Sequence, residues 1–229
     1  MEDLEEKRYG VPVLESIIIV IVAYVASIYV TQVVYLILFP YEYALHFAMM
    51  SGELIIGTLP ILFLIRNGIS PSEYTRFRFN IESILIGSLL GVAMWLFNMN
   101  VVRIVYMLFG PSESIERTNK IVSLLIGTDF GLLLTTISMI ITSISEEIAY
   151  RGLLYNALDR AYGSNVAILG SSIVFGLSHF DLTGVYIFVT FLLGLILSYT
   201  YSKKRNLGIV IIMHFLNNFL GVLVVKLFG

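Results

Sequence analysis

The stretch LLLTTISMIITSISEEIAYRGLLYNAL, residues 132–158, decides the fold of this chain. It is long and apolar enough to cross a lipid bilayer, which takes about 20 such residues as a helix. It nevertheless contains Glu146, Glu147 and Arg151. An ionisable side chain inside a membrane costs roughly 2.5 to 3.5 kcal/mol on insertion scales, so it usually pairs, lines a water-filled cavity or does chemistry. We interpret the stretch as a spanning helix that carries functional side chains.

The rest of the chain is equally apolar. Of its 229 residues, 58% are hydrophobic and 13% are charged, and the mean hydropathy is +0.89. Soluble globular domains do not have this composition. We predict an all-α fold, a polytopic transmembrane helix bundle of about seven spans, or eight. Residues 1–229 would form a single integral membrane domain.

Seven apolar segments separated by polar or Gly- and Pro-containing loops predict the spans. A polar, acidic tail at residues 1–10 precedes them, and residues 121–126 are too short to span, which indicates an interfacial or re-entrant segment. The expected spans are residues 13–39, 43–65, 81–109, 132–158, 166–180, 185–201 and 207–228.

The basic residues are distributed unevenly over the predicted loops. Seven spans place nine Lys and Arg residues on the side of the amino terminus and three on the other side. Basic residues favour the cytoplasmic side, so we expect a multi-pass protein of a prokaryotic plasma membrane with a cytoplasmic amino terminus. The net charge of -2 and the lack of long basic runs give no support for nucleic-acid binding. The absence of Cys excludes a thiolate nucleophile and a thiolate metal site.

Residues four apart share one face of a helix, at about 100° per residue. Glu147 and Arg151 can therefore form an ion pair, which leaves Glu146 free to accept a proton from a substrate or a water. The same spacing joins His214 to Asn218 and Phe175 to His179. We expect Phe175 to be a wall of the pocket.

The depths of these side chains are compatible with one shared site. At about 1.5 Å of rise per residue, Glu146 and His179 lie roughly 20 Å from the basic side, Asn218 about 15 Å and His214 about 9 Å. Helix tilt can absorb that spread. We predict an active-site cavity between spans four, five and seven that opens toward the cytoplasmic face.

Two mechanisms fit this set of groups. Glu146 could act as a general base with His179 holding the water, while His214 and Asn218 donate to an oxyanion. Alternatively, Glu146, His179 and His214 could bind a catalytic Zn²⁺, since two His and one carboxylate suit that ion. The spacing alone leaves both mechanisms open.

Three motifs within residues 141–220 resemble those of a known family. EEIAYR at 146–151, FGLSH at 175–179 and HFLNN at 214–218 resemble the EExxxR, FxxxH and HxxxN motifs of the CPBP family, which includes type II CAAX prenyl endopeptidases and bacteriocin-processing or self-immunity proteins. The resemblance implies that Glu146 and His179 activate water and that His214 and Asn218 bind the oxyanion, with Glu147 and Arg151 in support.

The leading functional hypothesis is an intramembrane endopeptidase that hydrolyses a peptide bond in a hydrophobic or lipidated substrate, by CAAX-type or leader-peptide processing. Its partners would be the lipid bilayer and a hydrophobic or prenylated peptide or protein. One alternative is a non-catalytic membrane scaffold or regulator of the same family. Another is a transporter or ion pathway that uses Glu53, Glu146 and His214, although no inverted repeat is evident. Nothing in the sequence indicates the oligomeric state.

Two further intramembrane charges need partners. Glu53 and Arg103 could pair across the second and third spans, and a role for Glu53 in lining a cavity stays open. We expect Asn98 and Asn100 to join helices rather than bind substrate.

Overall fold

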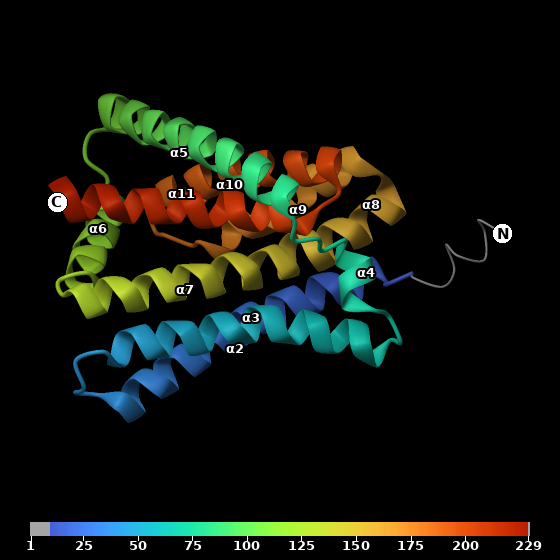
Figure 1. The fold of residues 1–229 in the computed structure, drawn as a ribbon, viewed down its shortest axis with the longest axis horizontal. Helices are drawn as coiled ribbons and strands as arrows, with labels where there is room; N and C mark the ends of the chain where they lie inside the picture. The colour runs from blue at the N-terminus through green and yellow to red at the C-terminus, as the bar shows by residue number, and fades with distance from the viewer. Residues whose placement is uncertain (1–9, 229) are drawn as a thin grey trace.

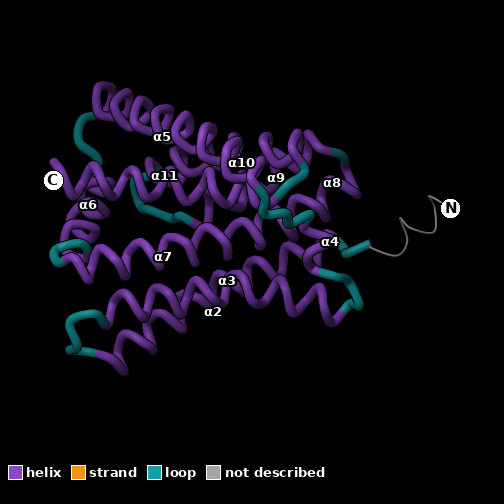
Figure 2. The backbone as a smooth tube through the Cα atoms, in the orientation of Figure 1, coloured by secondary structure: helices purple, strands orange, loops and turns teal. Residues whose placement is uncertain are grey.

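The structure, a computed structural model, describes residues 10–228. Throughout that range the regular elements are helices joined by short loops (Figure 2), which confirms the predicted fold class. The predicted polar tail falls, except for Gly10, outside the described residues. The elements are α2 (Val13–Leu38), α3 (Ala44–Arg66), α4 (Pro71–Thr75), α5 (Ile81–Phe109), α6 (Glu113–Leu125), α7 (Asp129–Glu147), η1 (Ile148–Tyr155), α8 (Asn156–Tyr162), α9 (Ser164–Ser178), α10 (Val185–Lys204) and α11 (Leu207–Phe228).

Six helices in the described part of the chain are long and apolar enough to cross a membrane. One of them is continuous from Asp129 to Tyr162 and comprises α7, the π-helical segment η1 and α8. The predicted fifth span is the shorter apolar helix α9. Its 15 residues extend over about 22 Å, less than the hydrocarbon thickness of about 30 Å. Since α9 is this short, the residues that follow it lie alongside the middle of their neighbours.

The long helix α7 lies at the centre of the bundle. In Figure 1 it runs between the α2–α3 hairpin on one side and α11 on the other, and α11 pairs in turn with α5, while α9 packs on α10. Glycines bring some of these helices very close. A Cβ at Gly57 of α3 would lie 2.8 Å from Oγ of Ser145 on α7. Close approach through small residues is the usual way in which membrane helices pack, and here it places α3 directly beside Glu146.

The two ends of the bundle carry different loops (Figure 1). The first described residues, α4 and α8 lie at one end, where α3 ends at Arg66 and α10 ends at Lys204. The carboxyl terminus and α6 lie at the other end. The predicted interfacial segment 121–126 is part of α6, which begins eight residues earlier and has none of its residues fully buried. An amphipathic helix of this kind suits a position at the membrane surface.

Candidate active site

Three helices bring one carboxylate and two imidazoles together. Glu146 stands near the end of α7, His179 follows the last residue of α9, and His214 lies in the first half of α11. Nε2 of His179 is 3.9 Å from Oε1 of Glu146, and Nε2 of His214 is 3.6 Å from its Oε2. Glu146 and His214 are buried, while 22% of the His179 side chain is exposed. A polar site therefore lies inside the bundle, with His179 closest to its opening.

The hydrogen bonds of the two rings define which nitrogen faces Glu146. Nδ1 of His179 lies 2.9 Å from the carbonyl oxygen of Phe175, and Nδ1 of His214 lies 2.9 Å from Oε1 of Glu147. A carbonyl oxygen and a carboxylate only accept, so each Nδ1 carries the donated proton. In the neutral ring the other nitrogen, Nε2, is then an acceptor. Both rings therefore direct Nε2 at Glu146.

The spacing around Glu146 suits one shared water. Distances of 3.6 and 3.9 Å are too long for direct hydrogen bonds. They approach the separation of about 4.5 Å between two atoms that each lie about 2.8 Å from the same water. Oε2 of Glu146 has no hydrogen-bond partner among the described residues. A water between Oε1 of Glu146 and Nε2 of His179 would bond to both, and a hydrogen bond to Oε2 would satisfy an oxygen that otherwise lacks a partner.

The ion pair predicted between Glu147 and Arg151 is present and fully buried. Nη1 of Arg151 donates to Oε1 of Glu147 over 2.9 Å. The guanidinium also donates through Nη2 to the carbonyl of Gly194 and through Nε to Oγ of Ser198, both on α10. Arg151 thus ties the central helix to α10, and the buried charge is paired and hydrogen-bonded, as burial requires.

Phe175 is the hydrophobic centre around which the site is packed. Its side chain is 2% exposed, and the Arg151 guanidinium lies 4.5 Å from the centre of its ring. The rings of His179 and His214 contact it edge-on, with centroids 4.8 and 5.9 Å away. Such contacts fix orientation more than they add energy. Phe175 therefore supports the two imidazoles from behind, and it does not line the cavity.

Asn218 lies one turn after His214 on α11, as its spacing predicts. Its Oδ1 accepts a hydrogen bond from Nδ2 of Asn217 over 3.1 Å, and its side chain does not line the cavity beside Glu146. The preceding Asn217 accepts a bond of 3.4 Å from Asn98 of α5. This contact agrees with the expectation that Asn98 joins helices.

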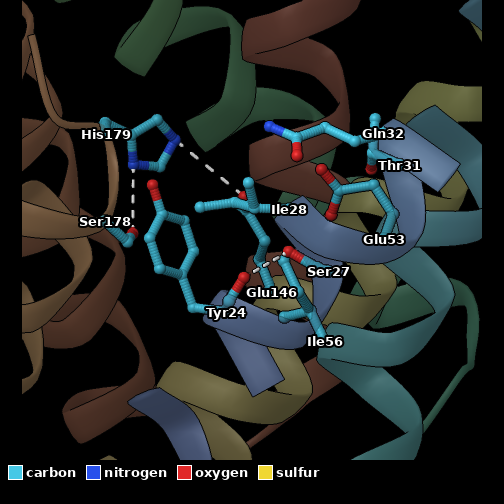
Figure 3. A pocket seen from close by; sticks show the side chains of 10 residues that line it. All are labelled: Tyr24, Ser27, Ile28, Thr31, Gln32, Glu53, Ile56, Glu146, Ser178 and His179. Carbon is cyan, nitrogen blue, oxygen red and sulfur yellow. Dashed lines mark hydrogen bonds and ion pairs between the residues drawn. The ribbon is translucent and has the colours of Figure 1, made fainter. Parts of the chain in front are cut away.

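A cavity of about 360 Å³ opens beside Glu146 and His179 (Figure 3). The prediction placed it between spans four, five and seven. Spans four and five do contribute, but the opposite wall comes from spans one and two, while His214 of span seven lies buried behind Glu146. The lining residues from the first two spans are Tyr24, Ser27, Ile28, Thr31 and Gln32 of α2 and Glu53 and Ile56 of α3.

Glu53 is one of these wall residues, and the pairing with Arg103 proposed from the sequence is wrong. Arg103 is exposed on α5, and no ion pair joins it to Glu53 in the described part of the chain. Helix α3 packs instead on α2 and α7, which turns Glu53 toward the interior. A signal for the α2 wall was present in the sequence, because Ser27 and Thr31 are four residues apart and form a polar stripe on an otherwise apolar helix.

A second cavity, of about 480 Å³, shares Tyr24, Ser178 and His179 with the first. Its other walls are α6, residues 180–183 and Tyr186 of α10, so it extends toward the end of the bundle opposite the Arg66 and Lys204 loops. The sequence predicted an opening toward those basic loops. The segment after His179 forms an edge of this path.

Asp181 holds that segment against α6. Its Oδ2 accepts hydrogen bonds from the hydroxyls of Ser114 and Thr183, and its Oδ1 accepts from the backbone N–H groups of Tyr186 and Ile187. Burial acts to raise the pKa of Asp181, but the bonds from Thr183, Ser114 and the backbone outweigh it and lower this pKa below its usual value.

The three side chains predicted as zinc ligands stand somewhat farther apart than the ligands of a bound zinc ion. Ligands about 2.0 to 2.1 Å from a tetrahedral Zn²⁺ lie about 3.3 Å from one another. His179 and His214 are farther than this from Glu146, and each faces a different oxygen. Among residues 10–228, no group of three His, Cys, Asp or Glu side chains has the arrangement of a metal site.

Comparison with known proteins agrees with the motifs. No curated protein and no solved structure matches the chain. Residues 128–220 match the family model described as Type II CAAX prenyl endopeptidase Rce1-like. The match contains the EEIAYR, FGLSH and HFLNN motifs, and therefore the acid and both imidazoles that meet in the bundle. This match over residues 128–220 supports the resemblance to the CPBP family, which includes the type II CAAX prenyl endopeptidases.

Proposed function

We propose that this protein is an intramembrane endopeptidase that hydrolyses a peptide bond in a hydrophobic or lipidated peptide, as in CAAX-type or leader-peptide processing. The observation that carries the proposal is that Nε2 of His179 and Nε2 of His214 both face Glu146 beside a cavity within the bundle. A carboxylate and two imidazoles around one water form a site that can activate that water.

Glu146 is the general base in this proposal. It takes a proton from a water that Nε2 of His179 holds as an acceptor, and the water oxygen attacks the scissile carbonyl carbon. Oε2 of Glu146 is 3.6 Å from Nε2 of His214, so the proton can pass to that ring while Glu147 holds its Nδ1–H. General-base catalysis of this kind contributes about 10² to 10⁴ in rate.

His214 and Asn218 stabilise the tetrahedral oxyanion. Once Nε2 of His214 has received the proton, it becomes a donor directed into the site. The Asn218 amide, on the same face of α11, is the second donor, and it reaches the oxyanion after turning away from its neighbour. Removal of one such donor typically costs about 10² to 10³ in kcat.

The substrate follows from where the site lies. It is enclosed by membrane-spanning helices, and its first cavity is lined by the bilayer-facing hairpin α2–α3. A peptide that carries a lipid or an apolar segment can enter such a site from the membrane, whereas a folded soluble protein cannot. The family match supports a prenylated peptide as the first probe.

The test uses purified full-length protein in detergent and a quenched fluorescent peptide that ends in farnesyl-cysteine and three further residues. We expect turnover by the wild type, a loss of about 10² or more for Glu146→Gln, and normal activity for Glu82→Gln, an exposed acid at the start of α5. Undiminished cleavage by Glu146→Gln overturns the proposed role. If that variant also restores the phenotype of a deletion strain, the protein is a scaffold rather than an enzyme.

A further inference from the structure

Glu53 is an acidic residue in the cavity wall that none of the three motifs contains. It stands in the middle of α3, within an otherwise apolar span. Its Oε2 is buried and has no hydrogen-bond partner among the described residues. The position is fixed by close helix packing, since a Cβ at the adjacent Gly52 would overlap the side chain of Thr31 on α2. An acid that is held this firmly in a membrane helix without a cationic partner is a candidate for a functional role.

The carboxyl group of Glu53 faces the same space as the catalytic groups. Figure 3 shows it extending from α3 toward the middle of the cavity, next to the Gln32 amide, with Glu146 and His179 on the far side. The side chain of Thr142, one turn before Glu146 on α7, interacts with it. Glu53 and Glu146 are close enough for their charges to interact. A peptide bond placed against Glu146 would therefore have Glu53 on its other side.

Amide hydrolysis needs a general acid in addition to the groups that activate the water. Glu146 and the two imidazoles account for the proton removed from water and for the oxyanion, but the leaving nitrogen must also gain a proton before the C–N bond breaks. Two carboxyl groups that face one small cavity repel each other when both are charged, and a proton kept on one of them removes that repulsion. The pair thus has one acid and one base available at the same time.

We propose that Glu53 is a second catalytic carboxyl group, the general acid that protonates the leaving nitrogen. This inference rests on the proposed peptidase function. As the tetrahedral intermediate collapses, the C–N bond breaks, the carbonyl re-forms, and the nitrogen takes the proton of Glu53, which becomes a carboxylate. The proton that was taken from water then passes from His214 and Glu146 to Glu53 across the cavity. The sum is one water and one peptide bond converted into one carboxylic acid and one amine.

A substrate with a different leaving group distinguishes a general-acid role of Glu53 from a structural role. In a thiodepsipeptide, sulfur replaces the scissile nitrogen, and the released thiolate needs no proton because the pKa of a thiol is about 8.5. A variant that lacks only the general acid should hydrolyse the thioester normally and the amide slowly. A variant with a distorted site should lose both activities together.

The experiment compares the wild type, Glu53→Gln, Glu146→Gln and the exposed-site control Glu82→Gln on two farnesylated probes, the peptide and its thioester analogue. We expect Glu53→Gln to lower kcat for the amide by about 10² or more, with a change of less than about threefold for the thioester. Glu146→Gln should lose both reactions, because both need an activated water. Equal losses on the two probes, or an unchanged amide rate for Glu53→Gln, overturn the role of Glu53 while the peptidase function stands. Absence of cleavage by the wild type overturns both.

Discussion

Nδ1 of His214 lies 2.9 Å from Oε1 of Glu147, so the acid that pairs with Arg151 also orients the imidazole that faces Glu146. The two residues of the acidic pair therefore have different tasks. Glu146 faces the cavity, and Glu147 acts from the buried side through another residue. Arg151 therefore holds the Glu147 carboxylate in place, and Glu147 in turn orients the ring of His214.

This chain predicts that stability and activity can be separated at Glu147. Glu147→Ala leaves the fully buried Arg151 without its counter-charge, which should cost about 3 to 5 kcal/mol of unfolding free energy. The double variant Glu147→Gln, Arg151→Met removes the charge as well and should recover most of that loss. Its turnover should stay low, because His214 is no longer oriented by a carboxylate. Thermal unfolding in detergent together with kcat measures both effects, and recovery of full activity by the double variant would contradict this role for Glu147.

Asn218 and its neighbour provide a matched pair of amides. Asn218→Ala should lower kcat by about 10² to 10³ with little change in KM, because an oxyanion donor acts only in the transition state. Asn217→Ala should mainly lower the unfolding temperature, since Asn217 bonds to Asn98 across helices. An effect of Asn218→Ala confined to KM would speak against oxyanion binding.

The close approach of α3 to α7 should be essential for activity. Gly57→Ala places a methyl group 2.8 Å from Oγ of Ser145, so the helices must separate beside Glu146, at a typical cost of about 1 to 3 kcal/mol. Gly221→Ala on α11 is the control, because a Cβ there meets nothing within 4 Å. We expect Gly57→Ala to have a lower turnover than the wild type and Gly221→Ala to have the same turnover as the wild type. Equal turnover in the two variants would show that the α3–α7 spacing does not position the site.

Asp181 should make the contact between α6 and the segment after His179 sensitive to acid. Its pKa is lowered in the folded protein, so its stabilising contribution is present above the pKa of the unfolded chain, about 3.9, and is lost as the pH falls through the folded value. The unfolding temperature of Asp181→Asn should lie below that of the wild type at pH 7, and the difference should shrink below about pH 4. A difference that stays constant down to pH 3 would contradict this reading of the hydrogen bonds.

Much of the fold was predictable because hydropathy depends only on local composition. All seven apolar segments are helices, and the polar loops separate them where Gly, Pro and charges interrupt the pattern. Side chains four residues apart on one helix could also be paired from the sequence alone. Glu147 and Arg151 pair as expected, although the intervening segment is a π-helix, for which no sequence signal was available. Such insertions often occur at functional sites.

The contacts between helices were not predictable from spacing. The pairing of Glu147 with His214 and the position of Glu53 depend on how each helix is rotated about its axis. Gly52 and Gly57 determine that rotation through close packing, and a single sequence does not reveal which helix a glycine will contact. The polar pair Ser27 and Thr31 marks one face of α2, but spacing does not say which helix that face will meet, and these residues line the cavity because α2 packs on α3.

Whether Glu146 activates the water can be measured by cleaving the farnesylated peptide in H₂¹⁸O and following the water oxygen by mass spectrometry. We predict one ¹⁸O atom in the new carboxyl group of the product released by the wild type, and at least about 10²-fold less product from Glu146→Gln at a matched protein concentration. Product of the same amount and labelling from Glu146→Gln would contradict the claim that Glu146 activates the water.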